Sequence, residues 1–185
     1  SFKGIGKIPK KVNKLSQVKT QKLLNDLPMY LKGIGRTLES MPGKKAIFVI
    51  LDSDDADCAE LKKDLVEMYE KSGVTVDVYF CIAIEEMEAW LLGDEKAIEE
   101  AYPQAKMPLL RKYVQDSIVG TWEYLADVVY SGGVNALKKK AESYYEIGLF
   151  KCECAGNIGM YLNIHENKSP SFNYFINKLN DFCEV

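Results

Sequence analysis

Apolar and polar residues follow strand and helix periods along the first half of the chain. Five apolar residues at 47–51 run directly into four carboxylates within the next six positions, a run typical of a strand buried on both faces of a parallel sheet. Residues 57–60 form a capping-box pattern that begins a helix of about 14 residues, which ends at Gly73. Residues 74–84 then alternate as a strand does. Strand, helix and strand at this spacing predict a βαβ unit with parallel strands.

Helical patterns flank this unit on both sides. Residues 20–38 are helical in period, and we expect Pro28 to begin a second helix capped by Asn25 or Asp26. After residue 84 the pattern predicts helices throughout, with Asp94 and Thr121 as caps. The expected segments are 95–102, 122–130, 134–145, 151–162 and a last helix from 169. The pattern thus predicts an α/β fold, with a mostly parallel sheet flanked by helices in residues 1–94 and a helical region in residues 95–185 packed on it.

Composition is that of an ordinary globular protein. The 185 residues are 47% hydrophobic and 28% charged, which suits one well-packed domain with a helical appendage. No apolar run approaches the roughly 20 residues that span a bilayer, and no stretch resembles a signal peptide. The five cysteines are an odd number, which favours reduced thiols. We therefore expect a cytoplasmic protein with no membrane segment.

Charge is distributed unevenly. Residues 1–45 carry eleven Lys or Arg against Asp26 and Glu39, a balance of +9 in a chain whose net charge is -3. A basic arm on an acidic body predicts a polyanionic partner such as nucleic acid. Gly4 and Gly6 flank a basic stretch that could form a loop whose amides and lysines meet phosphate. The alternatives are a solvated helical face and a mobile terminus.

Acidic residues follow both predicted strands. Asp52 and Asp54 lie on the same side of an extended chain, and Glu85 and Glu88 follow the second strand, on one face if a helix starts at Glu85. Carboxylate oxygens select Mg²⁺ or Mn²⁺ over zinc, and such sites serve phosphoryl chemistry. The alternative is that acids in a first helical turn complement the helix dipole.

Histidine and cysteine offer a weaker candidate site. His165 is the only histidine and lies in the polar loop 163–169. Cys152 and Cys154 with His165 and Cys183 contain the residue types of a zinc site, but their spacing matches no standard zinc motif. We expect these cysteines to be helix thiols and His165 to have no catalytic role.

Several motifs together resemble a known family. They are Gly6-Lys7-Ile8-Pro9-Lys10, Leu27-Pro28, Leu51-Asp52-Ser53-Asp54 with Asp57-Cys58, residues 83–94 (AIEEMEAWLLGD), Ala101-Tyr102-Pro103, Gly120-Thr121-Trp122-Glu123 and residues 167–172 (NKSPSF). Over nearly its whole length the chain resembles the bacterial domain of unknown function 4276 (DUF4276). That family is similar to TOPRIM domains, the metal-binding fold of topoisomerases, primases and OLD-type nucleases. Its members resemble nuclease-type partners of ATPases in phage-defence operons.

The resemblance implies roles for particular residues. The TOPRIM acidic pair falls on Asp52 and Asp54, the later acidic motif falls on Glu85 and Glu88, and these four would hold Mg²⁺. Lys7 and Lys168 are candidate phosphate contacts. TOPRIM domains place a further catalytic glutamate on an upstream strand, and we expect this sequence to begin too late to contain it.

Three functions follow as expectations. The first is a TOPRIM-like, Mg²⁺-dependent phosphodiesterase that cleaves nucleic acid, as the effector partner of a defence-system ATPase. The second is an inactive TOPRIM-like subunit that docks on an ATPase or on nucleic acid. The third is a metal-dependent glycosyltransferase, which would need a nucleotide-binding half before the acidic motif, and about 45 mostly helical residues are too few for one.

Overall fold

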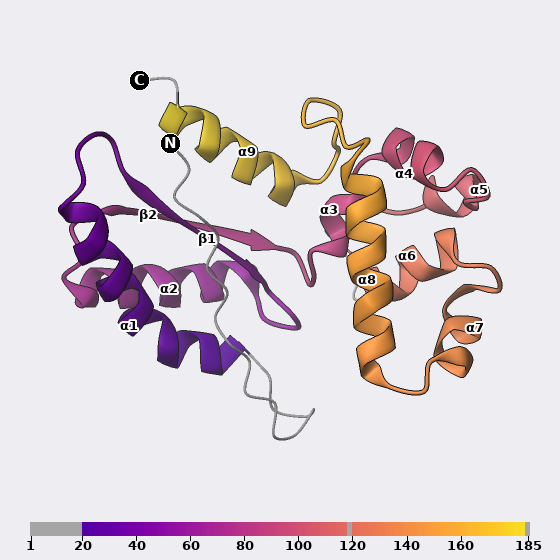
Figure 1. Cartoon of the computed structure of the whole chain (residues 1–185), viewed down its shortest axis with the longest axis horizontal. Helices are drawn as coiled ribbons and strands as arrows, with labels where there is room; N and C mark the ends of the chain where they lie inside the picture. The colour runs from indigo at the N-terminus through magenta and orange to yellow at the C-terminus, as the bar shows by residue number, and fades with distance from the viewer. Residues whose placement is uncertain (1–19, 118–119, 184–185) are drawn as a thin grey trace.

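A parallel βαβ unit forms the first half of the protein. The computed structural model describes residues 20–117 and 120–183 (Figure 1). Strands β1 (Ala46–Asp52) and β2 (Asp77–Ala83) pair in parallel, with Ala46 opposite Asp77 and Asp52 opposite Ala83. In this part of the chain the sheet has two strands. The predicted mixed α/β class and strand pairing are confirmed, and both strands end at the same edge.

Helix α2 (Cys58–Ser72) is the crossover, and its two ends match the local sequence signals. The Asp57 carboxylate accepts hydrogen bonds from the amides of Ala59 and Glu60, both at 2.9 Å. A cap of this kind stabilises a helix by about 1 kcal/mol. Gly73 ends α2 with a φ of 70°, a left-handed conformation that costs glycine little.

Helix α1 (Thr20–Glu39) is continuous, so the expectation that Pro28 begins a second helix is wrong. Proline has no N–H to donate and loosens the helix where it sits. Tertiary packing compensates for this loss, because Leu27 and Leu31 are buried against Leu61 and Leu65 of α2. Burying such a side chain stabilises the fold by about 2 kcal/mol, comparable to what the proline costs.

The predicted helical region is confirmed, with different boundaries for its later helices. A second apolar core includes Leu92, Ile98, Leu125 and Ile158, and it lies among the helices that follow β2. These helices are α3 (Glu88–Leu92), α4 (Glu95–Ala101), α5 (Met107–Leu110), α6 (Thr121–Val129), α7 (Gly133–Lys140) and α8 (Tyr144–Gly159). No helix in the described ranges is long and apolar enough to cross a membrane.

The last helix, α9 (Pro170–Cys183), returns to the sheet (Figure 1). The ring of Phe48 on β1 lies 6.4 Å from that of Phe175 and 5.9 Å from that of Phe182, centroid to centroid. Trp90 of α3 stacks on Phe175 with centroids 5.4 Å apart. Helix α9 therefore contacts both halves of the molecule. The division at residue 94 stays a prediction, and the structure adds that this late helix packs on the early strands.

Candidate functional site at the carboxyl edge of the sheet

The loops that follow the two strands are tied to each other. The Ser53 amide donates to the Ala83 carbonyl at 3.0 Å, and the Asp54 amide donates to the Glu85 carbonyl at 2.9 Å. The buried Ser53 hydroxyl accepts from the Glu85 amide at 2.7 Å. These bonds hold the backbones of Asp54 and Glu85 side by side at the carboxyl edge. We call this region, with the side chains of Asp52, Asp54, Glu85, Glu86 and Glu88, the acidic edge.

Glu85 does not begin a helix. Its φ is 62°, in the left-handed region, and α3 starts only at Glu88. The expectation that Glu85 and Glu88 share a helical face is therefore wrong. Asp54, hydrogen-bonded to Glu85, also has a positive φ, 49°. Such backbone costs energy for residues other than glycine, and the bonds between the two loops offset that cost.

The Glu85 carboxylate caps a different helix. It accepts hydrogen bonds from the amide of Gly120 and, at 2.6 Å, from the amide of Thr121, the first residue of α6. The expectation that Thr121 caps this helix is wrong, since the N-cap residue is Gly120 and the buried Thr121 hydroxyl makes no hydrogen bond. A carboxylate at a helix N-terminus is favoured by the dipole and by charge-assisted hydrogen bonds. Glu85 thus joins the acidic edge to the helical region.

Glu88 is buried and shares a lysine with Glu86. The Lys151 ammonium of α8 lies 3.0 Å from a Glu86 carboxylate oxygen and 3.3 Å from a Glu88 oxygen. Burial raises the pKa of Glu88, Lys151 opposes this rise, and the negative charge of Asp52 adds to it. Asp52 is thus one of the charges that act on Glu88, with a smaller effect than burial and Lys151.

Lys151 supplies this cluster with a cation from the chain itself. Burial alone would lower the pKa of Lys151, and the two carboxylates together outweigh that effect, so its pKa is raised. The pKa of Glu86 is also raised, chiefly by burial. One ammonium therefore serves the carboxylates of both Glu86 and Glu88.

Asp116 and Tyr113, which the sequence patterns did not indicate, lie near the acidic edge. Asp116 has a φ of 57°, and its carboxylate accepts from the Ser169 hydroxyl at 3.0 Å and the Ser171 amide at 2.7 Å, at the start of α9. Burial raises the pKa of Tyr113 to about 12, helped by the charges of Asp116 and then Glu85. The only sequence signal for an acidic residue here was the helix-start pattern around Ser169, because the free amides at the start of a helix need a hydrogen-bond acceptor.

The remaining candidates lie apart from this cluster. Lys168 pairs with Glu95 at the exposed surface, and Lys7, like Gly4 and Gly6, lies outside the described residues. His165 is exposed. All five cysteines are free thiols, as expected; on α8, Cys152 is exposed and Cys154 is buried.

The residues of the acidic edge are of the types that bind a magnesium ion, but two of them already contact other groups of the chain. Carboxylate oxygens are the ligands that Mg²⁺ prefers. Glu85, however, faces backbone amides and Glu88 faces Lys151. Across residues 20–117 and 120–183, no three His, Cys, Asp or Glu side chains are arranged to hold a metal ion.

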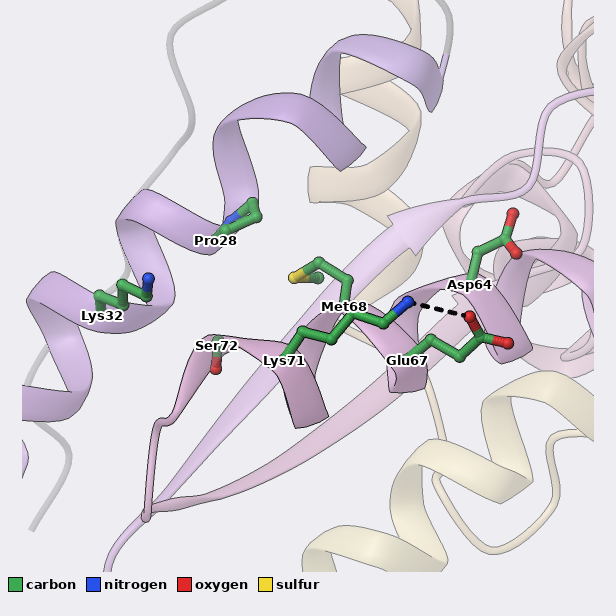
Figure 2. Close-up of a pocket in the computed structure, with 7 residues that line it drawn as sticks. All are labelled: Pro28, Lys32, Asp64, Glu67, Met68, Lys71 and Ser72. Atoms are coloured by element: carbon green, nitrogen blue, oxygen red, sulfur yellow. Dashed lines mark hydrogen bonds and ion pairs between the residues drawn. The ribbon is translucent and has the colours of Figure 1, made fainter.

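A groove between α1 and α2 offers no competing site. Figure 2 shows Pro28 and Lys32 of α1 across from Met68 and Lys71 of α2, whose ammonium lies 3.3 Å from the Glu67 carboxylate. Helix α2 runs back along the parallel strands, so its C-terminal half lies toward the sheet edge opposite the acidic one. The groove is wide open to solvent and holds ordinary surface charges.

The fold and site define an α/β protein whose acidic residues gather at the carboxyl edge of a parallel sheet. A family model described as "Domain of unknown function (DUF4276)" matches residues 1–180, and the chain belongs to this family. Comparison with curated proteins and with solved structures finds no match.

Proposed function

We propose that this protein is a TOPRIM-like phosphodiesterase that cleaves DNA or RNA with Mg²⁺ or Mn²⁺ and works as the effector of an ATPase partner. One observation carries the proposal: the loop after β1 is hydrogen-bonded to the loop after β2, Ser53 to Ala83 and Asp54 to Glu85, so the acidic residues of both loops lie at one edge of the sheet. Acidic residues that follow two neighbouring parallel strands thus lie where α/β proteins place their ligands. The resemblance of the motifs around Asp52 and Glu85 to those of TOPRIM domains supports the same activity.

In this proposal Asp52, Asp54, Glu85 and Glu88 are the acidic residues of the site. A bound divalent ion would neutralise charge on a phosphodiester and activate water. The chain's own contribution is to hold the Asp52 loop against the Glu85 loop through Ser53. Lys151 opposes the rise that burial causes in the pKa of Glu88, and Lys7 and Lys168 remain candidate phosphate contacts.

The experiment compares two variants with substitutions in one loop. Single- and double-stranded DNA and RNA are incubated with Mg²⁺ or Mn²⁺ and the wild-type protein, Asp52→Asn with Asp54→Asn, or Asp55→Asn. We expect the double substitution to lower cleavage by about a hundredfold or more, the scale of one lost group for electrostatic stabilisation. Asp55→Asn, an exposed acid of the same loop, should cleave normally. Cleavage that survives Asp52→Ala with Asp54→Ala would refute the proposal.

A second candidate function is an inactive TOPRIM-like subunit that binds nucleic acid or an ATPase. The observation that favours it is Lys151, whose ammonium already lies at the carboxylates of Glu86 and Glu88. Binding of nucleic acid that weakens steeply with salt, together with no turnover in Mg²⁺ or Mn²⁺, would support this function over the first.

A further inference from the structure

The N-terminus of α6 offers more hydrogen-bond donors than its carboxylate partner uses. The Glu85 carboxylate accepts from the amides of Gly120 and Thr121. The Thr121 side chain is fully buried, and its hydroxyl has no hydrogen-bond partner in the described part of the chain. A buried hydroxyl without a partner destabilises a fold. This hydroxyl therefore indicates a ligand that the chain itself does not supply.

The Thr121 hydroxyl lies beside the two amides. Only Cα and Cβ separate its oxygen from the amide nitrogen of the same residue, so the two atoms lie within about 4 Å of each other in every rotamer. That nitrogen donates to Glu85 at 2.6 Å. Gly120 has a φ of 97°, and a left-handed residue before a helical one directs successive amides toward one anion. Two amides and one hydroxyl thus surround the Glu85 carboxylate.

Tyr113 has a second buried hydroxyl near the start of α6. Its ring lies 5.3 Å, centroid to centroid, from that of Tyr124 in the first turn of this helix. Tyr113 is 7% exposed, and its hydroxyl makes no hydrogen bond of normal geometry within residues 20–117 and 120–183. Burial raises its pKa to about 12, with the charge of Glu85 among the smaller contributions. The hydroxyl is therefore protonated at neutral pH and able to donate.

These donors suit a phosphate group better than a carboxylate. Amides at a helix N-terminus and the positive end of the helix dipole favour an anion. The Glu85 carboxylate holds its two oxygens in one plane and accepts from the two amides. A phosphate carries its oxygens at the corners of a tetrahedron, so it can also accept from a hydroxyl outside that plane. Glu85 thus satisfies only part of the donor set.

We propose that the N-terminus of α6 is a phosphate-binding site, in which the amides of Gly120 and Thr121 and the Thr121 hydroxyl hold a phosphodiester of nucleic acid. Glu85 occupies this site until the substrate displaces it. The inference rests on the proposed function, because the backbone of Glu85 lies at the acidic edge. The phosphate site is then one glutamate side chain away from that edge. Displacement also frees the Glu85 carboxylate for the cation that the proposed function requires.

The test is chemical rescue of a variant that lacks the Glu85 carboxylate. Inorganic phosphate and dimethyl phosphate are titrated into Glu85→Ala and into the wild-type protein, in EDTA and at an ionic strength held constant with NaCl. At about ten times its dissociation constant, either anion should raise the thermal midpoint of Glu85→Ala by about 3–6 °C. The wild-type midpoint should rise by under about 1 °C, because its own carboxylate competes for the site.

Two further variants separate this site from an ordinary helix start. Thr121→Val, added to Glu85→Ala, should weaken the binding of either anion at least about tenfold, because a hydrogen bond to a charged group is lost. The substitution removes no hydrogen bond of the Thr121 side chain from the protein without ligand. The matched control is Asp57→Ala, which removes the carboxylate cap of α2, a helix whose first turn has no hydroxyl side chain. Its midpoint should rise no more than that of the wild-type protein.

Three results would overturn the proposal. They are a Glu85→Ala midpoint that rises no more than that of Asp57→Ala, a rescue that Thr121→Val leaves unchanged, and a rescue by inorganic phosphate without one by dimethyl phosphate. Should Glu85→Ala fail to fold, Glu85→Gln keeps one acceptor oxygen and should show the same excess over the wild-type protein. No metal or nucleic acid is present, so a failed rescue leaves the cleavage proposal standing, and a protein that cleaves nothing can still show the rescue.

Discussion

Gly93 faces the side-chain amide of Asn167, and a β carbon at position 93 would collide with that amide's oxygen. The same amide oxygen accepts from the Ser169 amide at 2.9 Å, and its nitrogen donates to the Trp90 carbonyl at 2.8 Å. The Lys168 amide also donates to the Gly93 carbonyl at 2.8 Å. The two longest motifs of the sequence therefore meet in space and form the joint that orients α9.

Gly93→Ala should destabilise the protein by about 2–3 kcal/mol, because the added methyl group displaces the buried Asn167 and leaves polar groups unsatisfied. The measurement is urea unfolding followed by circular dichroism. Gly33→Ala, at an exposed helical glycine with open space, is the control and should stabilise slightly. Equal effects of the two substitutions would show that the Gly93 joint is not tightly packed.

Lys151→Met should destabilise the protein by about 3 kcal/mol at pH 8, since it leaves the buried Glu88 carboxylate without its cation. The loss should shrink toward pH 5. The pKa values of Glu86 and Glu88 are already raised in the folded state, so the folded state binds protons more readily than the unfolded one and gains stability as the pH falls. Removing Lys151 raises both pKa values further. The gain in stability on lowering the pH therefore begins at a higher pH in Lys151→Met than in the wild-type protein.

Two variants check this prediction by urea unfolding at pH 5 and pH 8. Lys151→Met combined with Glu88→Gln should recover much of the loss at pH 8, because the more buried of the two carboxylates then carries no charge. Lys71→Met removes an exposed ion pair with Glu67 and should cost under about 0.5 kcal/mol at either pH. A Lys151→Met loss independent of pH would mean that the lysine acts through packing alone.

Glu85→Ala should destabilise the protein by about 1–2 kcal/mol in buffer containing EDTA, because α6 loses the acceptor for the amides of Gly120 and Thr121. Glu85→Gln keeps one acceptor oxygen and should cost less. The readout is the thermal midpoint without metal, which separates helix capping from any role in cation binding. An unchanged thermal midpoint for Glu85→Ala would show that capping by Glu85 does not stabilise the protein.

Cys81 and Cys154 should resist alkylation in the native protein at pH 8, whereas exposed Cys183 reacts. Burial raises the pKa of each buried thiol to about 11, so almost no thiolate is present to react. For the same reason the free energy of unfolding should fall between about pH 9 and pH 11, where only unfolded thiols ionise. Mass spectrometry of iodoacetamide-treated protein identifies the labelled residues, and rapid labelling of Cys154 would contradict its burial.

Local signals predicted the βαβ unit well because its determinants are local. Asp57 at the N-cap and Gly73 at the C-cap act within a few residues, and the structure confirms both caps and a strand within residues 74–84. Pro28 failed as a boundary because the energy of tertiary packing exceeds the local cost of proline inside a helix.

The sequence predicts where the acidic edge lies, but not which hydrogen bonds and ion pairs its side chains make. Parallel strands bring Asp52 and Glu88 to one edge, which the strand pattern implies. The contacts that set each side chain's state come from far along the chain: Ser53 fixes Glu85, Gly120 and Thr121 occupy its oxygens, and Lys151 reaches Glu88. No periodicity encodes such pairs, so only the folded arrangement reveals them.

The return of α9 to the sheet changes how the helices between β2 and α9 can vary. The chain leaves the sheet after Ala83 and comes back with Phe175 and Phe182 against Phe48. Helices α3 to α8 are therefore topologically an insertion, anchored at both of its ends. Such a segment can lengthen, shorten or acquire a new binding partner during evolution while the strands keep their pairing and the acidic residues keep their backbone support.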